Sequence, residues 1–522
     1  MKRLLPLLLL ALAPAALFAA DFDLLIRGAR VVDGTGSPWF RADVGVSAGV
    51  IVAVGSLSEA TATRVVEARE LILAPGFIDV HTHVEDEIEN LPDAANYLRD
   101  GVTTIVTGNC GGSRTDLAAF FTRLEELGMG PNLASLIGHN TVRRKVMGSD
   151  DRRAEPDEIA AMQTLVDTAM RDGAVGLSTG LIYVPGTYAG TDEVIALAEV
   201  ATRHGGVYAT HMRSDGLEVM AAIAEAIEVG RQTRIPVEIS HFKVASPKMW
   251  GRADEIVALV ERARLDGVDV VVDQYPYEWS STGLSSTLPS WALAGGQDRL
   301  VERLRDPATR ARIAVEMVRD LKAEGYKDYS YAVVARFEPD PTIEGKSITE
   351  INRLRGRRKG LKNEIDTILE LMEAGGAQML YHKMSNRDVE RILRYPNTAV
   401  ASDGHIIDPG VGVPHPRSYG TNARVLAEYV RTRKLLTVEE AVRRMTSLPA
   451  RTFRLQDRGL IRPGCAADLV LFDPDRIADR ATLASPHHYS EGFALVTVNG
   501  AVVVEGDALT GARPGRVLRH RP

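Results

Sequence analysis

The sequence predicts an α/β protein: a (β/α)8 TIM barrel with a small β-sandwich domain built from both termini and a long insertion after strand 7. The chain has 522 residues, of which 45% are hydrophobic, so it can bury a large core. Through the middle of the chain, apolar runs that end in polar residues alternate with helical patterns. Both ends of the chain instead contain short strand-like runs separated by turn signals.

Eight apolar runs are expected to form the strands of the barrel. They are Phe77–His83, Thr103–Cys110, Leu133–His139, Val175–Thr179, Gly206–His211, Pro236–His241, Val268–Tyr275 and Thr398–Asp403. Helical patterns such as Ile159–Arg171 and Thr191–Arg203 lie between them. A doubly wound sheet is the structural alternative, but only a closed barrel gathers eight polar strand ends around one mouth.

The domain boundaries follow from these patterns. Residues 76–454 are expected to form the barrel, and residues 21–75 together with 455–522 the small β-sandwich domain. Asn499-Gly500, between two apolar runs near the C-terminus, is a strong signal for a β-hairpin. Residues 279–384 lie in the seventh connection, which is too long for a simple loop and is expected to form a lid over the barrel mouth.

The first 20 residues have the pattern of a secretory signal peptide. A basic start is followed by the apolar stretch Leu4–Ala20, which ends in small residues. A membrane anchor is the alternative, but the stretch is short and is broken by Pro6 and Pro14. We therefore expect a periplasmic or secreted protein without stable membrane insertion after the signal peptide is cleaved.

Composition narrows the class of partner. The net charge of −7 and a pI near 6.0 do not indicate a nucleic-acid-binding protein. The basic run 353–359 is more simply explained as a solvated helix end than as a nucleic-acid-binding patch. Two cysteines exclude a disulfide scaffold and a cysteine-rich zinc module. The expected partner is a small molecule, and the sequence leaves open whether the chain forms a homo-oligomer.

Metal-ligand residue types stand at the ends of five predicted strands. They are His81, His83, Cys110, His211, His241 and Asp403. Because His81 and His83 are two residues apart on a strand, their imidazoles share one face. Each histidine alone would be weak evidence, but the strand ends of a barrel converge in space. The joint pattern therefore predicts a metal centre at the barrel mouth.

The residue types favour a borderline ion such as Zn²⁺, one or two per subunit. Six candidate ligands exceed the needs of one tetrahedral ion, so either two ions share Cys110 or one ion is bound tightly and another weakly. Such an ion activates water and polarises a carbonyl, which suits hydrolysis of an amide. Asp403 is expected to be the general acid and base that moves the proton from the water to the leaving nitrogen.

Several motifs together resemble the N-acyl-D-amino-acid deacylase (D-aminoacylase) family of the amidohydrolase superfamily. They are Gly76–His83, Gly108–Gly111, Gly138–Asn140, Gly176–Leu181, Thr210–Arg213, Ser240–Lys243, Asp273–Tyr277, Ser402–Gly404 and His415–Arg417, in the family's order over nearly the whole chain. The resemblance implies a bridging role for Cys110 and substrate-carboxylate anchors at Lys243 and Tyr275. It also implies hydrolysis of N-acyl-D-amino acids to a D-amino acid and a carboxylate. The D configuration comes from the resemblance alone.

The resemblance leaves alternatives for the substrate. A dipeptidase acting on dipeptides with a C-terminal D-residue would use the same carboxylate anchors and the same scissile amide. A cyclic-amide hydrolase, similar to dihydroorotases or hydantoinases, is a further alternative. The insertion does not reveal the preferred side chain or acyl group, and it leaves open whether His382 or Lys383 faces the substrate.

Other classes of protein are also compatible with parts of the sequence. Gly176–Gly180 fits the G-x-S-x-G motif of serine hydrolases, but Pro185-Gly186 stands where the required helix should begin. Cys110 could pair with Cys465 in an oxidising compartment, although a cysteine at the barrel mouth is not expected to reach the β-sandwich domain. A barrel that lost its metal and kept a binding role is the non-catalytic alternative.

Overall fold

The computed structural model describes residues 20–520 and contains a closed parallel barrel. Its strands are β6 (Phe77–Asp79), β7 (Val102–Thr107), β8 (Asn132–Ser135), β9 (Ile137–Gly138), β10 (Gly176–Gly180), β11 (Val207–His211), β12 (Val237–Ile239), β13 (Val270–Gln274) and β17 (Thr398–Val400). Strands β6 to β8 form one parallel run and β9 to β17 another. A parallel bridge between Thr82 and Gly404 joins the first strand to the last. The predicted fold class is confirmed.

Two details of the barrel differ from the expectation. The third predicted strand is divided into β8 and β9 at Leu136, whose N–H donates to the carbonyl of Thr107 on the neighbouring strand (2.9 Å). Several strands also end before the predicted ligands: β12 ends at Ile239, and His241 follows it in a loop. Apolar periodicity identifies a buried strand but does not report where its backbone turns away from the ladder.

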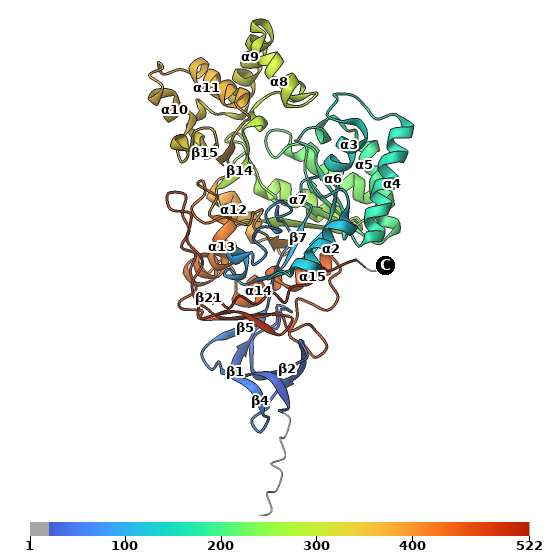
Figure 1. Ribbon diagram of the computed structural model, residues 1–522, viewed down its shortest axis with the longest axis vertical. Helices are drawn as coiled ribbons and strands as arrows, with labels where there is room; N and C mark the ends of the chain where they lie inside the picture. Colours follow the sequence, from blue (N-terminus) through green and yellow to red (C-terminus); the bar gives the residue numbers. More distant parts are fainter. Residues whose placement is uncertain (1–19, 521–522) are drawn as a thin grey trace, which may run out of the picture.

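Amphipathic helices surround the barrel, as Figure 1 shows. They include α2 (Leu117–Leu127), α3 (His139–Met147), α4 (Pro156–Asp172), α5 (Thr191–Arg203), α6 (Val219–Thr233), α7 (Ala253–Leu265), α12 (Asn386–Leu393), α13 (Arg417–Arg424) and α14 (Val438–Met445). In α5, Val194, Leu197 and Ala201 are buried on one face at helical spacing. Among the described residues, none of the helices is long and apolar enough to cross a membrane.

Strands from both ends of the chain form one nine-stranded sheet at the base of the molecule (Figure 1). Its members are β1 (Phe22–Val31), β2 (Phe40–Ser47), β3 (Val50–Gly55), β4 (Ala62–Glu67), β5 (Ile72–Pro75), β18 (Leu469–Phe472), β19 (Phe493–Val498), β20 (Ala501–Glu505) and β21 (Ala508–Leu509). The two ends meet where β5 pairs antiparallel with β18. The predicted hairpin is present: Asn499 and Gly500 have φ of 47° and 80° between β19 and β20. Residues 1–19, almost all of the predicted signal peptide, lie outside the described residues.

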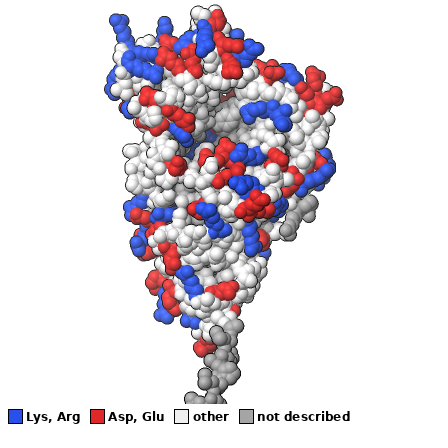
Figure 2. Space-filling view, viewed as in Figure 1, with Lys and Arg blue, Asp and Glu red and all other residues white. Residues whose placement is uncertain are grey.

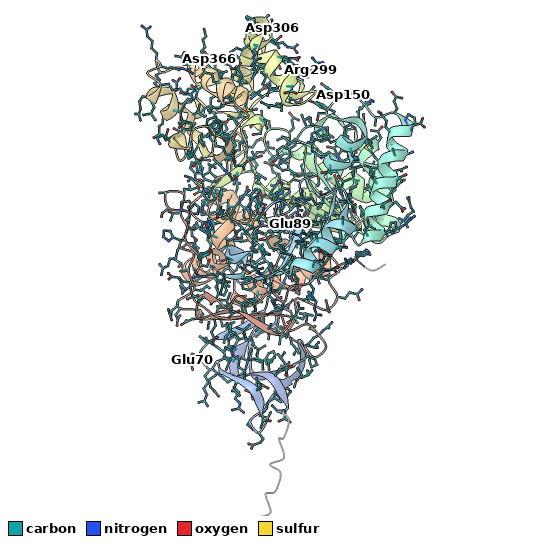
Figure 3. All side chains as sticks on the ribbon, viewed as in Figure 1. Glu70, Glu89, Asp150, Arg299, Asp306 and Asp366 are labelled. Atoms are coloured by element: carbon teal, nitrogen blue, oxygen red, sulfur yellow. The ribbon has the colours of Figure 1, made fainter. Side chains whose placement is uncertain are left out.

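The seventh connection contains a subdomain with its own core. It consists of β14 (Trp279–Gly283), β15 (Ala332–Arg336), β16 (Gln378–His382), α8 (Gln297–Arg305), α9 (Pro307–Glu324), α10 (Ile348–Leu354) and α11 (Leu361–Glu373). Buried apolar side chains such as Ile313, Met317 and Ile368 join its helices. Asp306, at the outer end of this subdomain in Figure 3, caps α9 by accepting from the backbone N–H of Thr309 (2.8 Å). Figure 2 shows a hollow between the subdomain and the barrel.

Candidate active site

The six predicted ligands lie together at the mouth of the barrel. The sulfur of Cys110 lies 3.3 Å from Nε2 of His81, 3.6 Å from Nδ1 of His211 and 3.7 Å from Nε2 of His241. Oδ1 of Asp403 lies 3.5 Å from Nε2 of His81. It lies 3.1 Å from Nε2 of His83, the sixth member of the group. Residues separated by more than 300 positions in the sequence therefore converge on one point.

The donor set of this cluster fits a metal ion. Three groups of ligand atoms each lie within 4.8 Å of one another: His81 with His83 and Cys110, Cys110 with His211 and His241, and His81 with His241 and Asp403. Nδ1 of His211 and Nε2 of His241 face each other at 2.7 Å beside the thiol. Lone pairs that converge in this way, buried from water, are satisfied together by a cation. Because Cys110 belongs to two groups, it is placed to serve two neighbouring ions.

The backbone is strained at three of these residues. Cys110, His241 and Asp403 have φ of 50°, 37° and 51°, in the left-handed region that non-glycine residues rarely adopt. Each follows the end of its strand, so the unusual conformation turns the side chain back over the mouth. Such strain persists where the surrounding structure imposes it, and it is concentrated at functional sites.

A buried carboxylate on β13 contacts the imidazole of His81 and the backbone of His241. Oδ2 of Asp273 lies 2.9 Å from Nδ1 of His81, and Oδ1 accepts from the backbone N–H of His241 (2.7 Å). Because the carboxylate can only accept, Nδ1 of His81 donates to it, and Nε2 is the nitrogen that faces Cys110 and can bind a metal. Asp273 belongs to a motif of the family resemblance, but the sequence assigns it no role. The available signal was an acidic residue in the apolar run of β13.

Arg417 is a second functional residue that the sequence did not assign. It is buried at the start of α13, and its guanidinium lies 2.8 Å from Oδ2 of Asp403. Burial alone would raise the pKa of Asp403, but the positive charge of Arg417 and the neighbouring imidazoles hold it well below the usual value. Asp403 is therefore a carboxylate, able to accept a proton. The triplet His415-Pro416-Arg417 was part of the resemblance, without a role.

A cavity of about 400 Å³ opens beside the cluster, between the barrel and the insertion. Lys243 and Tyr275, the predicted carboxylate anchors, both line it. Nζ of Lys243 lies 2.9 Å from Oδ2 of Asp215 and 2.6 Å from Nδ1 of His241. The hydroxyl of Tyr275 is buried and has no hydrogen-bond partner among the described residues. The cavity thus offers a cation and a free hydroxyl donor next to the ligand cluster.

Two alternatives from the sequence are wrong. Ser178 is fully buried in β10, where its hydroxyl accepts from the backbone N–H of Gly111 (3.1 Å) and donates to the carbonyl of Gly108. It does not line the cavity and is not followed directly by a helix. Cys110 and Cys465 are both free thiols, the latter buried in the core of the terminal sheet. Neither a serine nucleophile nor a disulfide explains the site.

A TIM barrel with this histidine, cysteine and carboxylate cluster at its mouth defines the class of metal-dependent hydrolases. Residues 64–504, which are most of the chain, match the model of the amidohydrolase family. The protein therefore belongs to the amidohydrolase family and is a metal-dependent hydrolase.

Individual relatives share nearly the whole chain. D-aminoacylase of Alcaligenes xylosoxydans xylosoxydans is 37% identical over 95% of this chain and 97% of its own. A D-aminoacylase structure with a binuclear metal centre, in which one metal activates and a second attenuates, matches with a TM-score of 0.82 and 36% identity, covering 95% of this chain and 100% of the other. N-acyl-D-glutamate deacylase of Bordetella bronchiseptica, in complex with zinc and a phosphonate mimic of the tetrahedral intermediate, matches with a TM-score of 0.81 and 34% identity over 95% and 99% of the two chains. The predicted resemblance is confirmed.

Proposed function

We propose that this protein hydrolyses the amide bond of small N-acyl-D-amino acids and releases a D-amino acid and a carboxylate. The observation that carries the proposal is the position of Lys243 and Tyr275, which line the same cavity as the ligand cluster. A substrate whose carboxylate meets these two side chains can place its neighbouring amide at the cluster. The names of the relatives support the D configuration and the acylated amine.

His81, His83, Cys110, His211, His241 and Asp403 would hold the metal, and we propose Zn²⁺, in one or two sites per subunit. The group of Cys110, His211 and His241 offers the softer, thiolate-containing site. When bound, such a cation polarises the scissile carbonyl and acidifies the attacking water. The zinc complex and the binuclear centre of the relatives support this choice.

Asp403 is the proposed general base and then general acid. Held ionised by Arg417 (2.8 Å), it accepts a proton from the water as the oxygen adds to the carbonyl carbon. It then delivers that proton to the amide nitrogen as the C–N bond breaks. The water oxygen remains in the carboxylate, and the nitrogen leaves as the amino group of the D-amino acid. Arg417 acts through Asp403 and is a positioning residue.

Lys243 and Tyr275 are proposed to bind the substrate carboxylate. The ammonium already pairs with Asp215 (2.9 Å), so the incoming carboxylate completes the coordination of a cation that is fixed in position. The Tyr275 hydroxyl gains its first partner in the same event. A fixed clamp of this kind holds the amide in a reactive orientation at low entropic cost.

A hydrolysis screen tests the function. Paired D and L forms of N-acetyl amino acids are offered together with dipeptides that end in a D-residue, with and without a chelator. We expect chelator-sensitive release of amino acid from the N-acetyl-D series, and metal in the purified protein. Exclusive turnover of dipeptides or of cyclic amides would replace the proposed substrate, and activity that survives full metal removal would refute the mechanism.

We also propose that the protein is exported, on the strength of the basic and apolar start of residues 1–20. Cell fractionation with N-terminal sequencing of the mature chain tests this. Export predicts a periplasmic or secreted protein that begins near residue 20. A cytoplasmic chain that keeps its first residue would contradict it.

A further inference from the structure

Three cationic side chains from Lys and Arg line the cavity, and two of them already have acidic partners. Lys243 pairs with Asp215, and Arg417 pairs with Asp403 (2.9 and 2.8 Å). The third is Lys383, which has no carboxylate within the 4.0 Å limit of an ion pair among residues 20–520. Its Nζ lies 4.8 Å from the centroid of the Tyr381 ring. Lys383 is therefore the cavity cation that lacks a partner.

The backbone of Lys383 is fixed from two sides. It directly follows β16, and its N–H donates to the carbonyl of Glu278 (3.3 Å). Its carbonyl accepts from Nε1 of Trp250 (2.8 Å). Burial lowers the pKa of the Lys383 ammonium more than the nearby carboxylates raise it, and the charge of Lys243 lowers it further. A desolvated ammonium in this position is stabilised by an anion that enters the cavity.

Lys383 lines the same cavity as Lys243 and Tyr275, the two residues proposed to bind the substrate's main-chain carboxylate. The side chain of an amino acid leaves from the carbon that carries this carboxylate. A second carboxylate on a short side chain therefore reaches the same part of the cavity. Two neighbouring cations fit a substrate with two acidic groups better than a substrate with one.

We propose that Lys383 binds a carboxylate on the substrate side chain, so that the enzyme prefers N-acyl derivatives of D-glutamate or D-aspartate. This inference rests on the proposed function and specifies its substrate. Lys383 is a specificity-determining residue contributed by the insertion. It takes no part in the proton transfer assigned to Asp403.

Acidic residues face the same cavity and give the competing preference. Asp320 is exposed and pairs with Arg319 (2.8 Å), so its charge is already compensated. Oε2 of Glu324 is buried without a hydrogen-bond partner among the described residues, which would suit a cationic side chain of the substrate. However, the Glu324 carboxylate lies against Gly216 at the wall, where a Cβ on that glycine would be 2.7 Å from Oε1. Glu324 is the competing charge in the cavity, and a substrate with a cationic side chain tests it directly.

The test compares substrates that differ only in charge. We expect kcat/KM for N-acetyl-D-glutamate to exceed that for the isosteric N-acetyl-D-glutamine at least about tenfold, the effect of one charge-assisted hydrogen bond. Lys383→Met should remove this preference and change kcat/KM for N-acetyl-D-glutamine less than about twofold. Lys383→Arg should keep the preference. Lys322→Met, which removes an exposed lysine on α9, is the matched control and should behave as wild type.

Three outcomes overturn the inference. One is a wild-type enzyme that hydrolyses N-acetyl-D-glutamine or N-acetyl-D-leucine without preferring the acidic substrate. Another is an equal loss for both substrates in Lys383→Met, which would make Lys383 structural. A preference for N-acetyl-D-arginine or N-acetyl-D-lysine would assign the specificity to Glu324 instead. Failure to hydrolyse any N-acetyl-D-amino acid would instead refute the proposed function itself, and the inference with it.

Discussion

Asp273→Asn should weaken metal binding while leaving the fold intact. The side chain keeps its size, and its carbonyl oxygen can still accept from the backbone N–H of His241, now 2.7 Å from Oδ1. Its amide group, however, presents a donor where Oδ2 lay 2.9 Å from Nδ1 of His81. The imidazole must then place its proton on Nε2, which faces Cys110 at 3.3 Å. The proton occupies the lone pair that a metal ion needs.

The expected loss follows from this single hydrogen bond. Removing the outer partner of a metal-binding histidine costs about 10- to 100-fold in metal affinity, or about 1.4 to 2.7 kcal/mol. Competition titration against a chromophoric chelator measures the affinity, and circular dichroism with thermal unfolding reports the fold. Asp269→Asn, at an exposed position immediately before β13, is the matched control. A metal affinity of Asp273→Asn within about twofold of wild type would refute the tautomer argument, because it predicts at least tenfold.

Two further predictions concern the proton transfer. Asp403→Asn should lower kcat by about 10²- to 10⁴-fold, because the general base is lost; the metal content should change little, since the other five ligands remain. Full activity with retained metal would remove Asp403 from the mechanism. In Arg417→Met, the pKa of Asp403 should rise, because the charge that lowers it is gone. Since Asp403 must be ionised to act as a base, the acid limb of the kcat/KM profile should move to higher pH. The charge-conserving Arg417→Lys should restore it, and an unmoved limb in Arg417→Met would contradict the electrostatic role.

The fold and the ligand cluster were predictable because both depend on local patterns. Each barrel strand lies within an apolar run, and each ligand stands at or just after the end of such a run. The barrel topology then brings strand ends together whatever the length of the intervening segments. This is why His81 and Asp403 could be placed side by side without any information on their contact.

The residues that tune the site were not predictable in the same way. Arg417 lies outside the eight predicted strands, at the start of α13 after the last barrel strand, and only the folded chain reveals its contact with Asp403. Asp215 reaches Lys243 from a loop after β11. The orientation of Lys383 depends on how β16 pairs with β14 and β15, an arrangement that leaves no periodic signal in the sequence. Single polar contacts across loops have no pattern until the backbone is in place.

The antiparallel pairing of β5 with β18 has a consequence for biosynthesis. Strand β5 ends at Pro75 and β18 begins at Leu469, so the whole catalytic domain is translated between the two strands of one ladder. During synthesis, the edge of β5 that pairs with β18 lacks its hydrogen-bonding partner until the ribosome has nearly finished the chain. An unpaired strand edge is a template for association with other chains. Truncation from the C-terminal side would expose this edge permanently. A circular permutant that joins the natural ends and opens the chain in the barrel's outer loops would instead synthesise both halves in succession.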